Sequence, residues 1–200
     1  MLIALNKPFQ LLSQFNPNPE TPDQATLRHL PIPLPDSVVP LGRLDYDSEG
    51  LLLLTDENNL EHQLLHPSNK HRRRYHVLVE GTPAPTDLEP LRSGQLTIRV
   101  SGKTHRCQPA KARTLKQAPD FLWPRDPPVR TRQNITDTWL VLELREGKNR
   151  QVRRMTAALG FPTLRLIRSG IGTLPLPELN LPPGQWTELN SSQRKLIFST

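Results

Sequence analysis

The chain contains almost no cysteine. Cys107 is its single cysteine in 200 residues, so an internal disulfide is excluded and a reducing compartment is indicated. Cys107 lies in an alternating stretch, which favours a small core residue over a reactive thiol.

Signals for membranes, metals and phosphate loops are also missing. The apolar run from Leu2 to Leu5 is too short for a signal peptide or a membrane span, and no segment resembles an interfacial helix. His62 and His66 lie four residues apart, but the internal glutamate of the zinc-protease motif is missing between them. No glycine-rich phosphate loop occurs. We therefore expect a cytoplasmic protein with no cofactor, no metal and no membrane partner.

Positive charge is abundant and concentrated. The formal net charge is +7, and residues 145–168 hold seven arginines and lysines against Glu146 alone, a local charge of +6. A second basic patch, residues 71–74, leads into a strand-like segment. Such clusters predict a polyanionic partner, RNA or DNA.

Short apolar runs alternate with turns along the chain. Strands are expected over residues 2–5, 50–55, 75–80, 96–100, 105–115, 138–144 and 163–168. Helices are expected over 24–30, 59–66, 86–91 and 149–159. This mixture predicts an α+β protein with a largely antiparallel sheet, and residues 1–200 suit a single domain, which can consist of two lobes.

The first informative motif runs from Gly42 to Gly50 and is followed at once by four leucines. Asp45 and Asp47 share one face of an extended chain with Arg43, which can hold one of them ionised. An ionised, positioned aspartate is a nucleophile or a base. The alternative is an ordinary turn before a buried strand, and spacing alone leaves both readings open.

The second motif runs from Glu146 to Met155 and continues to Gly160. We expect a strand end, a turn and a helix, with Val152, Met155, Thr156 and Leu159 on one packing stripe. Gly160 suits the left-handed residue after a helix. Cations gather at the start of this helix, where they oppose its dipole unless an anion such as Asp45 or an RNA phosphate lies nearby. A solvated basic surface is the alternative.

Residues 119–134 form a long proline-rich insertion between two strands. Trp123, Arg125, Arg130 and Arg132 offer stacking and phosphate contacts there. An RNA-docking loop and a lid packed by its own aromatics are equally open.

Together, the two motifs resemble the RsuA-type family of RNA pseudouridine synthases. Its signatures read G-R-L-D-x-D-[ST]-x-G-L-L-L-L-T and E-G-x-N-R-Q-[IV]-R-R-M, and both are matched without a gap. The resemblance implies the pseudouridine synthase fold, a mixed and mainly antiparallel sheet flanked by a few helices and loops, with a central catalytic cleft. It implies an isomerase that converts uridine to pseudouridine on a flipped-out nucleotide, without a cofactor.

The resemblance also implies roles for individual residues. Asp45 corresponds to the nucleophile, Tyr75 to the tyrosine that stacks on the uracil, and Arg153 to the arginine that ion-pairs with the catalytic aspartate. Arg43 corresponds to an arginine at the flipped nucleotide, Leu166 or Ile167 to an apolar floor beneath the base, and Arg73 replaces the family's lysine before the tyrosine. The expected substrate contacts are Arg43, Arg73, Lys148, Asn149, Arg150, Gln151, Arg154, Arg165 and Leu166.

Family members differ in their substrates. We expect this chain to begin directly at the catalytic part, without the N-terminal S4-type module of many relatives. The sequences of residues 47–50 and 122–130 resemble those of members that act on the large ribosomal subunit. The expected substrate is a uridine of 23S ribosomal RNA, free or in an assembly intermediate, and the expected state is a monomer. Two rival hypotheses are a non-catalytic ribosome-associated RNA-binding protein and an Asp-dependent hydrolase.

Overall fold

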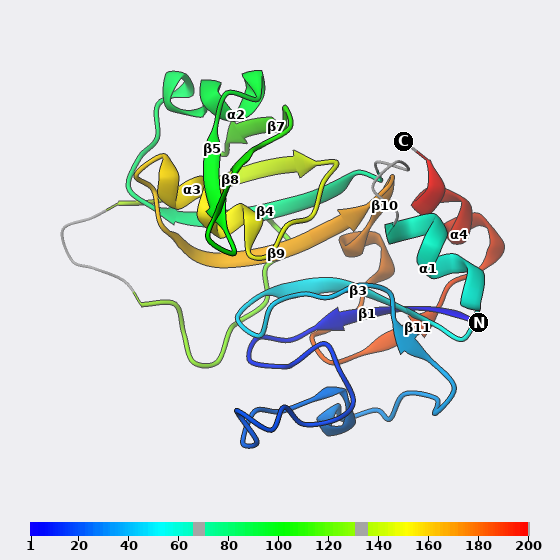
Figure 1. Cartoon of the computed structure of the whole chain (residues 1–200). Helices are drawn as coiled ribbons and strands as arrows, with labels where there is room; N and C mark the ends of the chain where they lie inside the picture. Colours follow the sequence, from blue (N-terminus) through cyan, green and yellow to red (C-terminus); the bar gives the residue numbers. More distant parts are fainter. Residues whose placement is uncertain (66–70, 131–135, 200) are drawn as a thin grey trace. The chain divides into compact units, whose positions relative to one another are not determined.

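The computed structural model describes residues 1–65, 71–130 and 136–199. The chain divides into two compact units (Figure 1). Unit 1 comprises Met1–His71 and Ile167–Thr200, and unit 2 comprises Arg72–Leu166. Within the described ranges, no helix has the length and apolar character needed to cross a membrane.

Unit 1 is built around strands from both ends of the chain. Its elements are β1 (Leu2–Lys7), η1 (Leu27–His29), β2 (Val39–Pro40), β3 (Glu49–Thr55), α1 (Asn58–Leu65), β10 (Leu174–Pro175), η4 (Leu176–Leu179), β11 (Trp186–Glu188) and α4 (Ser191–Phe198). The strand order is β11, β1, β3 and then β9 (Thr163–Ile171), whose last five residues belong to this unit. β3 pairs antiparallel with β1 and parallel with β9, so the sheet is mixed.

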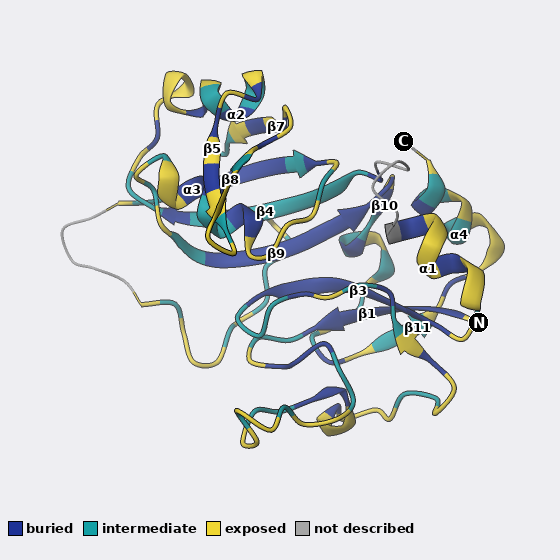
Figure 2. Ribbon diagram, in the orientation of Figure 1, coloured by how far each residue is buried: buried dark blue, intermediate teal, exposed yellow. Residues whose placement is uncertain are grey.

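Every residue of β1 and β3 is buried (Figure 2). The continuous leucine run of residues 51–54 is typical of a strand covered on both faces. Gly50 begins this run with a φ of +101°, and a Cβ there would lie 2.4 Å from the carbonyl oxygen of Arg168. Only glycine permits this close approach of β3 to β9. The start of β3, which overlaps the end of the first sequence motif, is therefore held at one place.

Unit 2 packs helices and a small hairpin on a second set of strands. Its elements are β4 (Arg73–Glu80), η3 (Pro85–Leu88), α2 (Glu89–Ser93), β5 (Thr97–Val100), β6 (Lys103–Arg106), β7 (Lys111–Thr114), β8 (Asp137–Leu144) and α3 (Gln151–Ala158). The strand order is β9, β4, β8 and β7, while β5 and β6 form a separate hairpin. The core between them contains Val77, Leu140, Val152 and Met155. The α+β class and the mixed sheet are thus confirmed.

Most of the expected elements are present, and the second motif folds as predicted. α1 and α3 lie where helices were expected, and Val152, Met155 and Thr156 of the predicted stripe are buried. Gly160 follows α3 with a φ of +87°. Cys107 is a core residue, 2% exposed.

Two expectations are wrong, and proline explains both. The helix expected over residues 24–30 is only the short 3-10 turn η1, because Leu30 precedes Pro31 and is extended, with ψ of 142°. The single strand expected over 105–115 is split into β6 and β7, which belong to different sheets. Pro109 lies in the break and cannot donate a ladder hydrogen bond.

Lys7 is a fully buried charged group at the end of β1. Its Nζ donates hydrogen bonds to the carbonyl oxygens of Pro8 at 2.9 Å and Leu11 at 2.6 Å. Burial lowers the pKa of Lys7 from 10.5 to about 7, although the charges of Glu49, Asp47 and Asp45 act to raise it. Removing an ammonium from water outweighs these attractions.

The lowered pKa of Lys7 predicts a specific pH dependence of stability. Between pH 7 and the ordinary lysine value, the unfolded chain binds one more proton than the folded chain. The free energy of unfolding of the wild type should therefore rise with pH relative to Lys7→Met, by at most about 1.4 kcal/mol per pH unit. Urea unfolding from pH 6.5 to 9.5 measures this difference.

Lys195→Met is the matched control, because Lys195 is exposed on α4. Its stability should keep a constant offset from the wild type over the same pH range. A difference between wild type and Lys7→Met that does not change with pH would contradict the lowered pKa.

Candidate active site

The turn that carries Asp45 is anchored by its backbone. The hydroxyl of Ser13 donates to the carbonyl oxygen of Leu44 at 2.9 Å and accepts from the backbone N–H of Leu44 at 3.0 Å. Leu44 itself packs into the core of unit 1. This two-way hydrogen bond holds the residue before Asp45 in one position.

The turn closes immediately after Asp45. The N–H of Ser48 donates to the carbonyl oxygen of Asp45 at 3.0 Å. Ser48 and Glu49 are buried, whereas Asp45 and Asp47 are half-buried and so remain accessible. Glu49 and Gly50 then enter β3 opposite Ile167 and Arg168 of β9. A rigid strand thus presents a carboxylate on a short, hydrogen-bonded turn.

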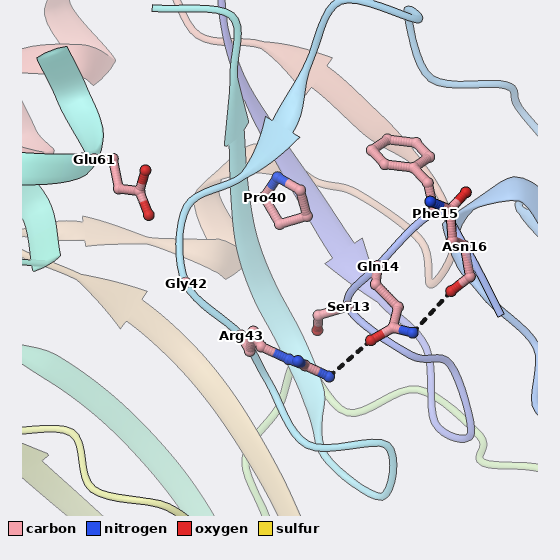
Figure 3. Close-up of a pocket in the computed structure, with 8 residues that line it drawn as sticks. All are labelled: Ser13, Gln14, Phe15, Asn16, Pro40, Gly42, Arg43 and Glu61. Carbon is pink, nitrogen blue, oxygen red and sulfur yellow. Dashed lines mark hydrogen bonds between the residues drawn. The ribbon is translucent and has the colours of Figure 1, made fainter. Parts of the chain in front are cut away.

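Arg43 is hydrogen-bonded to a glutamine of the N-terminal segment. Its Nη2 donates to Oε1 of Gln14 at 2.9 Å, and the side chain is exposed. Arg43 and Gln14 line an open cavity of about 530 Å³ together with Ser13 and Phe15 (Figure 3). Gln14 is held in turn by donating to the carbonyl oxygen of Asn16 at 2.8 Å. The side chain of Arg43 is therefore oriented along the wall of this cavity.

Lys7, which is absent from the predicted site, is a cation on which the carboxylates of the turn act. The charges of Glu49, Asp47 and Asp45 all act on its pKa. A lysine that ends a strand of apolar residues was the available signal, because a charge is rarely buried without partners. Arg168 is a second buried cation in this unit, and its Nε donates to the carbonyl oxygen of Leu51 at 2.7 Å.

In unit 2, the second motif forms a compact turn before α3. Glu146 accepts hydrogen bonds from the side chains of His105 and Gln151 and from the backbone N–H of Gln108. Gln151 also accepts from the backbone N–H of Lys148 at 2.8 Å. Arg150 stands at the N-cap with a φ of 49°.

Lys148, Asn149 and Arg150 are exposed at this end of α3. The first turn of a helix carries N–H groups without intrahelical partners and a partial positive charge. Added lysine and arginine side chains make this end a place where an anion is stabilised.

The other two residues expected in catalysis also lie in unit 2. Arg153 is half-buried on α3, and its Nη1 donates to the carbonyl oxygen of Thr163 at 3.4 Å. Tyr75 is half-buried on β4, opposite Leu142 of β8, and packs against the core cluster. Arg73 is on the same face of β4, and its guanidinium lies close to Gly147 of the second motif. Leu166 is 4% exposed and belongs to the core of this unit.

Arg154 and Arg165, two more of the expected RNA contacts, also have partners within the protein. Arg154 donates to the carbonyl oxygen of Arg99 at 2.8 Å and to that of Asn149 at 3.1 Å. Arg165 is 6% exposed, donates to the carbonyl oxygen of Trp123 at 3.0 Å and stands over the Trp123 ring. These bonds connect α3 to β5 and to the turn before α3, and β9 to the loop that carries Trp123.

The proline-rich insertion resembles a packed lid over its described part. Phe121 contacts His76 edge to face at 4.9 Å and lies beside Trp123. Arg125 donates to the carbonyl oxygens of Pro127 at 2.9 Å and Pro128 at 3.0 Å. Arg130 is exposed, whereas Arg132 lies outside the described residues. The structure therefore favours the lid over the RNA-docking loop for residues 119–130.

One group of side chains has the composition of a metal site. Ligand atoms of His105, Cys107 and Glu146 all lie within 4.8 Å of one another. Burial raises the pKa of the Cys107 thiol, helped by the charge of Glu146, and His105 is hydrogen-bonded to Glu146 at 2.9 Å. The donors around Glu146 fit a structural role in the turn before α3. His66 of the histidine pair considered above lies outside the described residues.

Known proteins resemble this chain over most of its length. A family model described as RNA pseudouridylate synthase matches residues 1–158. The protein named ribosomal large subunit pseudouridine synthase E in Xanthomonas campestris pv. campestris is 50% identical over 186 residues, which cover 93% of this chain and 94% of that protein. The protein of the same name in Vibrio parahaemolyticus is 46% identical and covers 94% of this chain and 73% of that protein.

A crystal structure of a pseudouridylate synthase has a similar fold. It superimposes with a TM-score of 0.75 at 28% identity and covers 98% of this chain and 73% of that chain. The family model covers both the Asp45 turn and the motif before α3. The chain therefore belongs to the RNA pseudouridylate synthase family and is an RNA pseudouridine synthase.

Proposed function

We propose that this enzyme converts a specific uridine of 23S ribosomal RNA to pseudouridine, with Asp45 as the nucleophile. The names of the 50% and 46% identical relatives support the large ribosomal subunit as the source of the RNA. The observation that carries the role of Asp45 is its turn, which Ser13 anchors through Leu44 and which presents an accessible carboxylate at the start of a buried strand.

The proposed reaction follows from these residue types. Asp45 attacks the ribosyl carbon as the bond from that carbon to the base nitrogen breaks, and the base turns. Its C5 carbon then displaces the Asp45 carboxylate from the sugar, the C5 proton is released, and the freed nitrogen takes up a proton. The nucleotide must first leave its stack, at a cost of a few kcal/mol. Stacking of the uracil on Tyr75 returns roughly 1 to 3 kcal/mol. Arg153 supplies a positive charge that favours the ionised form of the nucleophile.

Residues around the start of α3 have the chemistry of RNA contacts. We assign phosphate binding to the exposed Lys148, Asn149 and Arg150, because backbone N–H groups and cations gather there. Arg43 contacts the flipped nucleotide from the wall of its cavity. Gln151, Arg154 and Arg165 support these contacts through hydrogen bonds to Lys148, to Arg99 of β5 and to Trp123. The guanidinium of Arg73 lies close to Gly147, and Leu166 or Ile167 provides the apolar surface beneath the base.

The remaining expectations are retained as parts of the proposal. The substrate is free 23S ribosomal RNA or an assembly intermediate, the enzyme acts in the cytoplasm as a monomer, and residues 1–200 act as one catalytic domain with two lobes. The central catalytic cleft expected from the family fold is the place of the reaction.

Asp45→Asn should abolish turnover but not RNA binding. Asparagine keeps the size of the side chain and removes the nucleophilic charge, so tritium release from 23S ribosomal RNA labelled at uridine C5 should fall roughly a thousand-fold or more. Release by the wild type should persist in a chelator, because no proposed step uses a metal.

Asp36→Asn is the matched control, because Asp36 is an exposed aspartate of the same unit. It should release tritium at the wild-type rate. Full activity of Asp45→Asn would remove Asp45 from the mechanism, and loss of wild-type tritium release in the chelator would show that the isomerisation requires a metal. If the wild type is silent on free RNA, the assay is repeated on immature large-subunit particles.

Tyr75→Leu should lower kcat/KM by about 5- to 150-fold, because it removes an aromatic stacking surface worth roughly 1 to 3 kcal/mol. Tyr75→Phe keeps the ring and should retain tight RNA binding. Since Tyr75 also packs against the core, thermal unfolding of both variants separates lost stability from lost stacking. A folded Tyr75→Leu enzyme with wild-type kcat/KM would contradict the stacking role.

A further inference from the structure

A basic cavity lies on the strands of unit 2. It has a volume of about 460 Å³ and is lined by Arg72, Arg74, His76, Lys111, Arg113 and Glu143, among others. We call this surface the basic cavity. The residues proposed for catalysis and for RNA contact above do not include any of these six.

The register of the strands explains why these side chains gather. Arg74 of β4 pairs with Glu143 of β8, which pairs with Lys111 of β7. One step along, His76 pairs with Val141, which pairs with Arg113. Side chains two residues apart share a face of a strand, so the two rows form one surface.

Tyr75 lies between Arg74 and His76 and packs against the core of unit 2. Because neighbouring side chains on a strand point to opposite faces, the basic cavity is on the other face of β4 from Tyr75. A ligand in the cavity is therefore separated by the sheet from a base stacked on Tyr75.

Positive charge exceeds negative charge in the cavity. Its four arginines and lysines face the single carboxylate of Glu143, which leaves three net positive charges when His76 is neutral. Glu143 lies 2.8 Å from Nε of Arg74, 3.4 Å from Nη1 of Arg72 and 4.0 Å from Nζ of Lys111. Lys111 is 81% exposed, and Arg113 is also exposed. These two cations are directed to solvent.

Burial and the positive charge of the cavity shift the pKa values of two groups, His76 and Glu143. Burial, together with the charges of Arg74 and Arg113, lowers the pKa of His76 to about 4. Burial raises the pKa of Glu143, but the hydrogen bond from Arg74 and the charges of Arg72 and Lys111 outweigh it and lower that pKa. Among the residues that line the cavity, the four cations outnumber the one carboxylate, so an added anion is stabilised there.

We propose that the basic cavity is a second RNA-binding site, which binds phosphates of the RNA backbone on the face of β4 opposite Tyr75. The proposal rests on the proposed function, because it takes RNA as the ligand of the enzyme. Three of the four cations are arginines, whose planar guanidinium matches phosphate geometry. Contacts of this kind orient an RNA without reading its sequence.

The test uses a double variant, Lys111→Gln with Arg113→Gln, which leaves the Arg74–Glu143 pair intact. The matched control is Lys103→Gln with Lys195→Gln. It also removes two positive charges, but from exposed positions outside the cavity. The probe is a fluorescein-labelled 30-nucleotide hairpin RNA of the large subunit, titrated by anisotropy from about 50 to 300 mM salt. Binding is measured without turnover, so its outcome does not depend on Asp45.

The cavity variant should bind the hairpin at least roughly ten-fold more weakly at about 100 mM salt, with a salt slope smaller by about 1.4 to 1.8, the value for two phosphate contacts. The control pair should change affinity less than about two-fold. Bound RNA should also raise the pKa of His76 in NMR titrations of the wild type, because a phosphate favours the imidazolium.

Three outcomes would overturn the proposal. The first is an unchanged salt slope in the cavity variant, and the second is an equal loss in the control pair. The third concerns poly-glutamate, an acidic polypeptide used as a second probe. If the cavity variant loses binding to poly-glutamate but binds RNA normally, the partner of the cavity is an acidic protein instead. Failure of the tritium-release assay with normal RNA binding would affect the proposed function and leave this site standing.

Discussion

One buried amino group, that of Lys7, connects the N-terminal strand of unit 1 to the electrostatics of the Asp45 turn. Lys7 ends a strand whose six residues are all buried, and its Nζ is held by the carbonyl oxygens of Pro8 and Leu11. A charge in such a place costs free energy unless carboxylates lie nearby, and the carboxylates that act on its pKa belong to the Asp45 turn and the start of β3. The burial of Lys7 at the end of β1 is therefore electrostatically coupled to the turn that carries the proposed nucleophile.

In the turn before α3, hydrogen bonds stabilise a carboxylate, that of Glu146. Glu146 accepts from three donors, and Gln151 connects it to the backbone of Lys148. Because Glu146 and Gln151 supply the hydrogen bonds of this turn, the side chains of Lys148 and Arg150 are not needed for it. They are exposed at the positive end of the helix. A run of cations that opposes the helix dipole is understandable in an enzyme whose substrate is a polyanion.

Pairing in β4 divides what the sequence presents as one basic patch. Arg73 and Tyr75 face the core and the second motif, whereas Arg74 and His76 face the basic cavity. The division follows from the two-residue period of a strand. The charged residues that join Arg74 on its face come from the neighbouring strands: Glu143 from β8 and Lys111 from β7. Both are far from Arg74 in the sequence.

The sequence by itself determined the local elements and the candidate residues. Leucine runs, the 3.6-residue stripe of α3 and Gly160 predicted buried strands and a capped helix, because those patterns depend only on nearby residues. The two signatures predicted the family. Only the tertiary structure decided that Arg43 contacts Gln14, that the charge of Asp45 acts on the buried Lys7, and that Arg154 and Arg165 bond to Arg99 and Trp123. It also split residues 105–115 between two sheets. Such partners are chosen by strand register and burial, which join residues that no spacing rule connects.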